Sequence, residues 1–411
     1  MKVVHISTSD KGGAGIAAVR LHNALLNAGI ESFLLTKLKS VNDIKNHFTL
    51  NPKSQLIFKL LDRIGITKKG SAAFARNHLA NRPAGFEYFS YPYSVIDIAN
   101  HPLVISADVI HLHWVSDQFL DFASFFKKIN KPVVWTLHDM NPFTGGCHQS
   151  DDCMGFTHSC INCVQLKDTI DEAYADVILR YKQNALSKIN PEKIIIIAPS
   201  QWLLNRSMQS LLFKPIQHKI IRNVIDGEKF ILLDRIKSRI EFNLPLDKKI
   251  ILFVANDIDN PRKGIVYLKQ AMEFFPHAIV CGIGKNSSAL DFKNFVDMGY
   301  ITDANKLASL YNAVDVFVLP SLAENFPNTI CESLLCGTPV VGFNIGGIPE
   351  LINNNNGRLA VYKDLTSLVS SIEDIFNNPE KFSRIEIRNA ALKMFDTSDV
   401  VKNHLEVYNS F

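Results

Sequence analysis

Two glutamates, Glu324 and Glu332, have the residue type and spacing that most clearly predict chemistry in this chain. The apolar segment 315–319 predicts a strand, and Pro327 favours the start of a helix. Glu324 is therefore expected in the loop at the carboxyl end of the strand, with Glu332 inside the helix. Ligands of parallel sheets bind at this edge, and a helix N-terminus attracts anions. Carboxylates beside an anion suit a ligand that also offers hydroxyls, which indicates a nucleotide-sugar.

A pair of cations, Arg262 and Lys263, follows another predicted strand at 249–255 and precedes a helical pattern. At the carboxyl end of a parallel strand they would face the same crevice as the two glutamates. An arginine fork and a lysine point charge can together neutralise a diphosphate. A solvated basic turn is the alternative interpretation.

His138 and Asp139 end a predicted strand in the first half of the chain. A histidine at that place can donate a hydrogen bond to a sugar hydroxyl or to an acceptor, although a purely structural histidine is the alternative. His111 and His113 alternate along a neighbouring strand, so both point to one face. We expect one of these two to be structural.

Three glycines, Gly12, Gly13 and Gly15, lie in a predicted turn at 11–15, before a helix at 16–27. Glycine allows the backbone to approach a phosphate or sugar without a Cβ clash. Their spacing differs from the dinucleotide pattern, and no acidic residue ends the second strand. An NAD site is therefore disfavoured, and a tight turn that serves packing alone is the alternative.

Four cysteines, Cys147, Cys153, Cys160 and Cys163, cluster within a short predicted loop. A cytosolic chain is not expected to keep structural disulfides, so the cluster favours a structural zinc with four thiolate ligands. Reduced thiols or an occasional disulfide are the alternatives.

The order of strands and helices predicts an α/β protein. Strands that are apolar throughout alternate with helical patterns in two series, which is typical of parallel sheets covered on both faces. We expect two Rossmann-like domains, at 1–225 (with the cysteine loop at 147–163) and 226–392. A closing helix at 393–411 is expected to cross back to the first domain.

Bulk composition is that of an ordinary globular protein, with 47% hydrophobic and 20% charged residues. A net charge of +4 gives no argument for nucleic acid as a partner. The chain shows neither a signal peptide nor a spanning segment, which predicts a cytoplasmic location. Residues 53–82 carry seven Lys or Arg against Asp62 alone, with apolar residues at helical spacing. This segment is either an ordinary solvated helix or a contact with the anionic inner face of the cell membrane.

In their order and spacing, these motifs resemble the GT-B glycosyltransferases of retaining family 4, over nearly the whole chain. The resemblance rests on the glycine loop at 12–15, the segment 136–139, the Arg262–Gly264 clamp, the Glu-x7-Glu motif and the glycines of segments 337–341 and 346–350. The segment 135–147 with the later cysteines resembles a bacterial branch that makes surface polysaccharides.

The resemblance implies two Rossmann-like domains whose parallel sheets face a deep interdomain cleft. It implies a catalytic group made of Glu324 on the donor sugar, Lys263 on the diphosphate and His138 near sugar and acceptor. It further implies donor-binding residues Gly13, Arg262, Lys263, Phe326, Pro327, Asn328, Thr329 and Glu332, the last on the ribose. Gly12, Gly15 and Asp139 are the other expected cleft residues. Family members often place the clamp arginine several residues earlier, where this chain has Ile258.

The expected reaction is transfer of a sugar from a UDP- or GDP-sugar to a hydroxyl of a glycan, lipid-linked if the basic segment meets a membrane, with retained anomeric configuration. The family needs no catalytic metal. A nucleotide-sugar epimerase of the same fold, or an inactive GT-B partner protein, are the competing hypotheses.

Overall fold

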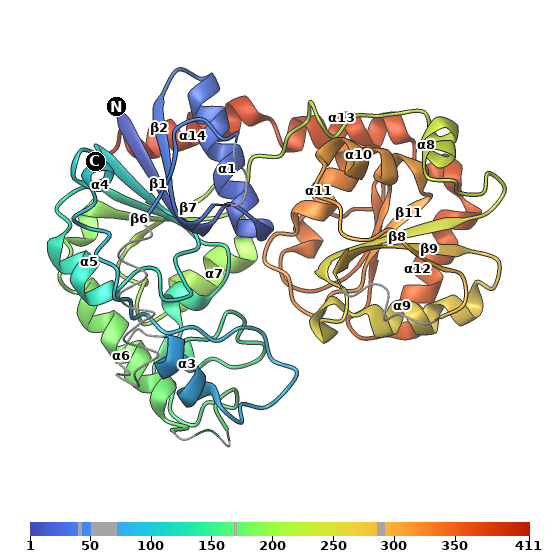
Figure 1. Ribbon diagram of the computed structural model, residues 1–411. Coiled ribbons are helices and arrows are strands. Elements are labelled where there is room, and N and C mark those ends of the chain that lie inside the picture. Colours follow the sequence, from blue (N-terminus) through green and yellow to red (C-terminus); the bar gives the residue numbers. More distant parts are fainter. Residues whose placement is uncertain (40–42, 51–71, 168, 170, 286–291) are drawn as a thin grey trace. The chain divides into compact units, whose positions relative to one another are not determined.

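The computed structural model describes residues 1–39, 43–50, 72–167, 169, 171–285 and 292–411. The chain divides into two compact units (Figure 1). The first unit comprises Met1–Arg222 together with Ser398–Phe411, and the second comprises Asn223–Thr397. The boundaries expected from the sequence, after residues 225 and 392, differ from these by three and five residues.

The first unit is built on a parallel sheet. Among the described residues, seven strands lie in the order β3-β2-β1-β4-β5-β6-β7, and neighbouring strands are parallel throughout. Their bounds are β1 Lys2–Ser9, β2 Glu31–Leu38, β3 His47–Thr49, β4 Val109–Leu112, β5 Val133–Thr136, β6 Ile194–Ala198 and β7 Gln217–Ile220. The central strands are buried along their whole length, as parallel strands covered on both faces must be.

Helices and short 3-10 turns connect these strands. Their bounds are α1 Gly12–Asn27, α3 Ala72–Leu79, α4 Pro102–Ile105, α5 Phe122–Lys128, η1 Asn141–Phe143, η2 Gly155–Thr157, α6 Tyr174–Leu186, η3 Pro191–Lys193, α7 Gln201–Gln209 and the closing α14 Thr397–Tyr408.

Alternation along the strands gives the two faces of this sheet different chemistry. On β1 and β4, Val4, Ile6, Ile110 and Leu112 belong to one apolar core, which also holds the phenylalanines of α5. The residues between them point to the opposite face, because side chains of a strand alternate. That opposite face carries histidines. The closing helix α14 lies on it, because the Tyr408 hydroxyl is 2.7 Å from His111 Nδ1.

The second unit repeats the architecture with a separate core. Among its described residues, six strands lie in the order β10-β9-β8-β11-β12-β13, again parallel. The strands are β8 Ile250–Asp257, β9 Ile279–Lys285, β10 Phe295–Asp297, β11 Val316–Leu319, β12 Val340–Phe343 and β13 Gly357–Ala360. The helices and turns are α8 Arg235–Glu241, η4 Pro261–Lys263, α9 Ile265–Ala271, η5 Met272–Phe274, α10 Ala304–Ala313, α11 Asn328–Leu335, η7 Ile348–Glu350, α12 Leu365–Asn377, η8 Pro379–Lys381 and α13 Arg384–Met394.

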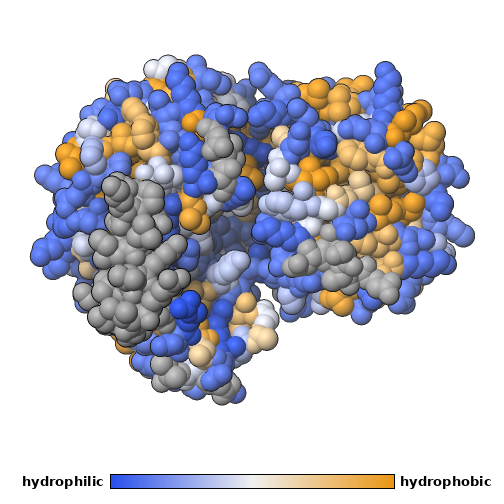
Figure 2. All heavy atoms as spheres, in the orientation of Figure 1, coloured by the Kyte–Doolittle hydropathy of each residue, from blue (hydrophilic) through white to orange (hydrophobic). Residues whose placement is uncertain are grey.

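The surface mixes polar and apolar residues, and Figure 2 shows apolar side chains in the region of α8 in the second unit. Ile236 and Ile240, one helical turn apart on α8, are 58% and 62% exposed. None of the helices in the described part of the chain has the length and apolar run that crossing a bilayer requires. Most of the basic segment 53–82 lies outside the described residues. Within its described end, Arg82 donates hydrogen bonds to the backbone and side chain of Gln165.

Candidate functional site

In the second unit, the candidate site begins where β8 and β11 run side by side. Because both strands are parallel, the loops that follow them emerge at the same edge of the sheet. The Leu322 N–H donates to the Arg262 carbonyl across 2.7 Å and ties the two loops together. Gly264 has a φ of +71°, and a Cβ there would lie 1.8 Å from the Pro320 carbonyl oxygen. Glycine at this position is therefore required for the loops to meet.

This close approach brings together two residues that the sequence analysis had assigned to one site. The Lys263 Nζ lies 2.6 Å from the Glu324 Oε1, in an ion pair that is largely shielded from solvent. Burial acts to raise the pKa of the Glu324 carboxyl, but the charges of Lys263 and Arg262 outweigh it, and the net pKa lies below the ordinary value. Glu324 is consequently ionised at neutral pH.

Arg262 and two later glycines fix the backbone around Glu324. The Arg262 guanidinium donates to the Ala323 carbonyl. The Gly347 N–H donates to the Glu324 carbonyl across 3.0 Å, and a Cβ on Gly346 would lie 1.9 Å from the same oxygen. The loop after β12 therefore packs directly on the glutamate, which explains the glycine pair that sequence reasoning noted without a role.

The α11 helix carries the second glutamate. It begins at Asn328, with Pro327 as its N-cap rather than as its first helical residue, as had been expected. Proline offers no side-chain acceptor, so its side chain makes no capping hydrogen bond to the N–H groups of the first turn. Glu332 is only 5% exposed, and the Tyr311 hydroxyl donates to its Oε2 across 3.4 Å.

The other predicted donor-binding residues lie around the start of α11. Phe326 belongs to the apolar core of the unit, and Thr329 is half-buried. The Asn223 amide donates to the Asn328 Oδ1 across 3.0 Å. These residues surround one helix terminus, which is an arrangement suited to an anionic ligand.

In the first unit, the three glycines occupy the first turn of α1, since the helix begins at Gly12 and not at Ile16 as predicted. Gly12 has a φ of +72°. A Cβ on Gly15 would lie 2.6 Å from the Ser9 carbonyl, whereas a Cβ on Gly13 would meet no atom within 4 Å. Gly15 is thus needed for packing against the end of β1. No packing contact in the described residues requires glycine at position 13.

His138 and Asp139 follow β5 and have different surroundings. Asp139 is held by its own loop: its carboxylate accepts from the Trp114 indole at 2.7 Å, contacts the His148 ring at 2.6 Å and accepts from the Asn141 N–H at 2.8 Å. Burial would raise the pKa of Asp139, but His148 and these donors keep it below the ordinary value. Asp139 therefore anchors the loop. His138 is half-buried, and its Nε2 lies 3.1 Å from His113 Nδ1.

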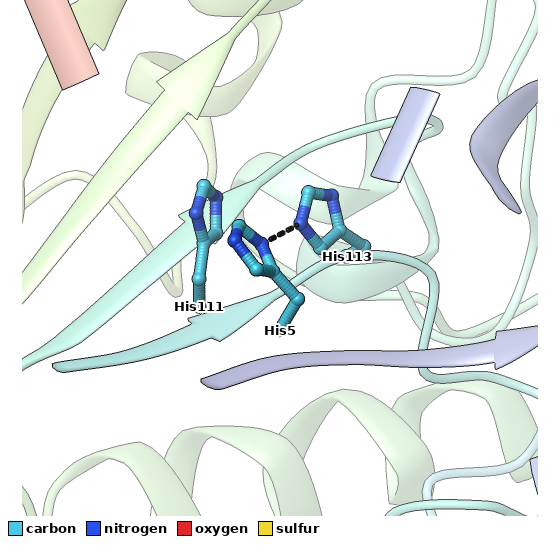
Figure 3. Close-up of side chains that lie close together, drawn as sticks. All are labelled: His5, His111 and His113. Atoms are coloured by element: carbon cyan, nitrogen blue, oxygen red, sulfur yellow. Dashed lines mark hydrogen bonds between the residues drawn. The ribbon is translucent and has the colours of Figure 1, made fainter. Parts of the chain in front are cut away.

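A group of buried histidines surrounds this contact. His111 and His113 are both buried, as is His5 on the neighbouring strand β1. The expectation that one of the first two is structural stays a prediction. His5 pairs in register with His111, and the three ring nitrogens lie within 4.8 Å of one another (Figure 3). Sequence reasoning missed His5. Its position in the middle of an apolar strand was the available signal.

The cysteine loop does not gather its four sulfurs. Among the described residues, the one set of three or more potential metal ligands close enough to share an ion is His5, His111 and His113. Zinc binding by the four thiols would therefore require their sulfurs to move closer together. Burial raises the pKa of the Cys147 and Cys160 thiols to about 12, which favours the protonated form. The zinc assignment stays a prediction.

Lys182 is a buried cation beside this loop that sequence reasoning also missed. Its Nζ donates to the Thr144 carbonyl across 3.1 Å and to the Asn141 carbonyl. Burial lowers its pKa to about 7, with Cys147 and Asp139 acting in the opposite direction. On α6 it lies on the same helical face as the buried Ile178 and Ala185, and this position among apolar residues was the available signal.

Comparison with known proteins identifies the domain that holds Lys263, Glu324 and Glu332. Residues 248–378 match the family model of Glycosyl transferases group 1. This segment is therefore similar to the glycosyl transferases of group 1. It spans the whole sheet of the second unit and ends in α12. The predicted cation pair and both glutamates fall inside it.

Relatives and solved structures extend the similarity to the rest of the chain. WcaC of Escherichia coli (strain K12), named as a colanic acid biosynthesis glycosyl transferase, is 27% identical over 370 residues, which is 87% of each chain. The N,N'-diacetylbacillosaminyl-diphospho-undecaprenol alpha-1,3-N-acetylgalactosaminyltransferase of Campylobacter jejuni is 27% identical over 58% of this chain and 67% of its own. Anabaena Alr3699/HepE, solved with UDP and glucose, covers both chains fully with a TM-score of 0.67 at 17% identity. The chain has the GT-B fold, and the domain match together with these relatives supports a glycosyltransferase.

Proposed function

We propose that this protein is a retaining glycosyltransferase of family 4 that transfers a sugar from a UDP- or GDP-sugar to a hydroxyl of a lipid-linked glycan in polysaccharide biosynthesis. One observation carries the proposal: Lys263 and Glu324, from loops after two adjacent parallel strands, meet at 2.6 Å at the edge of the sheet where ligands of such sheets bind. A cation for the diphosphate thus lies beside a carboxylate for the sugar.

The chemistry follows from the charges. Cleavage of the bond between the sugar and the diphosphate places negative charge on the leaving group, and Lys263 with Arg262 can stabilise that charge. Before the donor binds, Glu324 neutralises Lys263 and keeps it ordered. With the donor bound, the ionised Glu324 accepts hydrogen bonds from sugar hydroxyls. Glu332 has the role of ribose ligand, and residues 326–329 hold phosphate oxygens near the first turn of α11.

The first unit contributes Gly13 and His138. Because no packing contact requires glycine at position 13, its function there is the close approach of a ligand to the backbone. His138 serves the donor sugar and the acceptor. No nucleophile is assigned, so a leaving phosphate oxygen takes the acceptor proton on the face that retains the configuration.

The donor and acceptor classes draw support from the relatives. Alr3699/HepE was solved with UDP and glucose, and the Campylobacter jejuni relative is named for a diphospho-undecaprenol substrate. A lipid-linked acceptor places the enzyme at the inner face of the cell membrane, where the basic segment 53–82 would meet anionic lipid.

Two measurements test the proposal. A donor that binds only the folded protein must raise its melting temperature, so a panel of UDP- and GDP-sugars should contain at least one stabilising member. Lys263→Ala should then lower turnover by at least ~10²-fold, the range for losing one charge-stabilising group. Lys306→Ala, an exposed lysine on α10, is the matched control and should transfer normally. Near-normal transfer by Lys263→Ala would refute the proposed role.

The stereochemistry and the competing reaction are read from the products. Retained anomeric configuration in the product, followed by proton NMR, is the expected result. Incubation with donor alone should leave the sugar's configuration unchanged, and an isomerised sugar would identify an epimerase instead. Absence of any nucleotide binding would identify an inactive partner protein.

The predicted zinc site has its own test. Elemental analysis of the purified protein should find one zinc per chain, and replacement of Cys160 and Cys163 by serine should remove it. A metal-free protein with four reactive thiols would refute the zinc prediction and leave the transfer reaction untouched.

A further inference from the structure

Three histidines of the first unit form a continuous hydrogen-bonded chain. His138 Nε2 lies 3.1 Å from His113 Nδ1, and His113 Nε2 lies 2.9 Å from His5 Nδ1. Figure 3 shows the contact between His5 and His113, whose rings project from β1 and from the end of β4 to the same side of the sheet. The chain therefore runs from the half-buried His138 into the interior, where His5 is fully buried.

All three rings are neutral near pH 7. Burial holds the pKa of His5 and of His113 well below the ordinary value, and burial lowers that of His138 to about 4, opposed by Asp139. The groups that face the chain from neighbouring elements include further imidazoles: His22 of α1, His111 of β4 and His404 of α14. Each neutral imidazole has one N–H and one lone pair.

The proton count allows two arrangements. Each contact between two rings needs one N–H, and His113 has a single proton for its two contacts. The chain must therefore point in one direction throughout. Either His5 donates to His113 and His113 donates to His138, or both bonds are reversed. Reversal of one bond alone would place two protons or two lone pairs against each other.

The buried end of the chain selects between these arrangements. Among the described residues, His5 Nε2 is buried and has no hydrogen-bond partner. In the first arrangement Nε2 of His5 is unprotonated and carries a lone pair. In the second arrangement Nε2 carries the proton. Unsatisfied buried N–H groups are rarer in proteins than under-satisfied acceptors. The first arrangement, with the proton of His5 on Nδ1, is therefore favoured.

We propose that His113 and His5 are positioning residues that hold His138 in a single tautomer, with its Nε2 lone pair facing His113 and its proton on Nδ1. The proposal rests on the proposed function insofar as His138 serves sugar and acceptor. Any group that meets Nδ1 must then accept a hydrogen bond. His138 acts at that atom as a donor to an oxygen of the ligand, and not as a base toward the acceptor hydroxyl.

The same rings also invite a competing interpretation as a metal site, because nitrogens of His5, His111 and His113 lie within 4.8 Å of one another. Their hydrogen bonds argue for the chain. His111 contacts the Tyr408 hydroxyl at 2.7 Å and the Thr136 hydroxyl at 2.7 Å, so both of its nitrogens are engaged. A divalent cation would have to replace the proton between His5 and His113 and displace one of these hydroxyls.

Nitrogen-15 NMR of histidine-labelled protein tests the proposal directly, because protonated and unprotonated ring nitrogens have well-separated shifts. The expected result is His138 as the Nδ1–H tautomer at pH 7.5. His5→Leu does not touch His138, but it removes the donor that fixes the tautomer of His113. His138 should then become a mixture of both tautomers. Turnover should fall in proportion to the lost Nδ1–H population, with an unchanged KM for the donor.

Controls separate this outcome from simple loss of structure. His113→Asn keeps an amide donor toward His138 and should retain more of the Nδ1–H tautomer than His113→Phe does. His218→Gln, on β7 and bonded to Ser207, should leave the His138 signal unchanged. An Nε2–H tautomer in the native protein, or an unchanged His138 signal in folded His5→Leu, would overturn the proposal.

The metal interpretation provides a third decisive outcome. Co²⁺ is added to the Cys160→Ser, Cys163→Ser variant, and its absorption spectrum is recorded. A tetrahedral spectrum that disappears with His113→Phe would show that these histidines form a metal site and not a hydrogen-bonded chain. The NMR result does not depend on activity. Failure of sugar transfer with every donor, together with a single His138 tautomer, would overturn the proposed function alone.

Discussion

The two units share an architecture but stabilise their interiors with different polar groups. All histidines except His277 lie in the first unit, where several are buried and neutral. The second unit instead buries charge in pairs: Arg239 meets Asp315 at 2.9 Å and Lys263 meets Glu324 at 2.6 Å. Two similar parallel sheets thus impose no common solution for the polar residues they bury.

The difference predicts two responses to acid. A buried neutral histidine has a pKa below that of the unfolded chain, so the unfolded state takes up protons first and stability falls as the pH drops below about 6.5. Glu324 has a lowered pKa, and its contribution is retained until the pH falls through the acidic range of carboxylates. The first unit should therefore weaken at a milder pH than the second.

The largest expected effect concerns the ion pairs. Arg239 on α8 is 5% exposed, donates to the Ala313 carbonyl at 2.8 Å and pairs with Asp315. Arg239→Leu should cost about 3 kcal/mol, the low end for breaking a buried pair, because Arg235 still holds Asp315 at 3.1 Å. Hydrogen exchange of peptides from residues 223–397 measures the loss of stability in the second unit. Lys237→Leu, exposed on the same helix, is the control. Equal protection in both variants would contradict the contrast between the units.

The acid response of the first unit comes next in size. Burial lowers the pKa of His404 to about 4, opposed by a hydrogen bond to Val400, so this residue alone should cost about 3 kcal/mol between pH 6.5 and pH 4. Tryptophan fluorescence reports the first unit selectively, because all three tryptophans lie in it. Urea midpoints should fall with pH, and less steeply in His404→Leu than in His158→Leu, which replaces an exposed histidine. If the urea midpoints of the two variants depended on pH in the same way, protonation of the buried His404 would not explain the loss of stability in acid.

A pair of glycine substitutions separates packing from ligand approach in the first unit. Gly15→Ala should destabilise by about 1–3 kcal/mol, since its Cβ would lie 2.6 Å from the Ser9 carbonyl. Gly13→Ala should change stability by less than about 0.5 kcal/mol, because nothing lies within 4 Å of its Cβ. Donor binding should nevertheless weaken in Gly13→Ala. Full donor affinity in that variant, measured by calorimetry, would remove Gly13 from the site.

The smallest expected effect concerns the hydrogen bond that holds α14 against the first sheet. Tyr408→Phe removes the hydroxyl that lies 2.7 Å from His111 Nδ1 and should cost about 1 kcal/mol. Tyr88→Phe, at a side chain that is 72% exposed, should cost nothing measurable. Equal urea midpoints for the two variants would show that apolar packing alone holds the helix.

Much of the fold could be predicted from the sequence, because fully buried parallel strands leave a strong apolar signal. Segments such as Ile194–Ala198 are recognisable without any structure. The start of α1 was misplaced because glycines at positions 12, 13 and 15 are typical of a turn, whereas here they form its first helical turn. Packing against β1 overrides that local preference.

In the second unit, the sequence predicted that two candidate site residues lie near one another, but it did not predict their contact. Motif order placed Lys263 and Glu324 at one sheet edge, yet their ion pair depends on Gly264 and Gly346 allowing two loops to close on one another. The chain of His5, His113 and His138 was not predictable, since it joins three strands through side-chain geometry. Spacing along one strand reveals a shared face and says nothing of proton direction.

The closing helix has a consequence for how the protein is made. The hydrogen bond between His111 and Tyr408 joins residues separated by 297 positions, with the whole second unit between them. At ribosomal speeds of about 5–20 residues per second, roughly 15–60 s pass between synthesis of the two partners. During that interval the histidine-bearing face of the first sheet lacks its cover. Nascent first units should therefore be clients of ribosome-associated chaperones until α14 arrives.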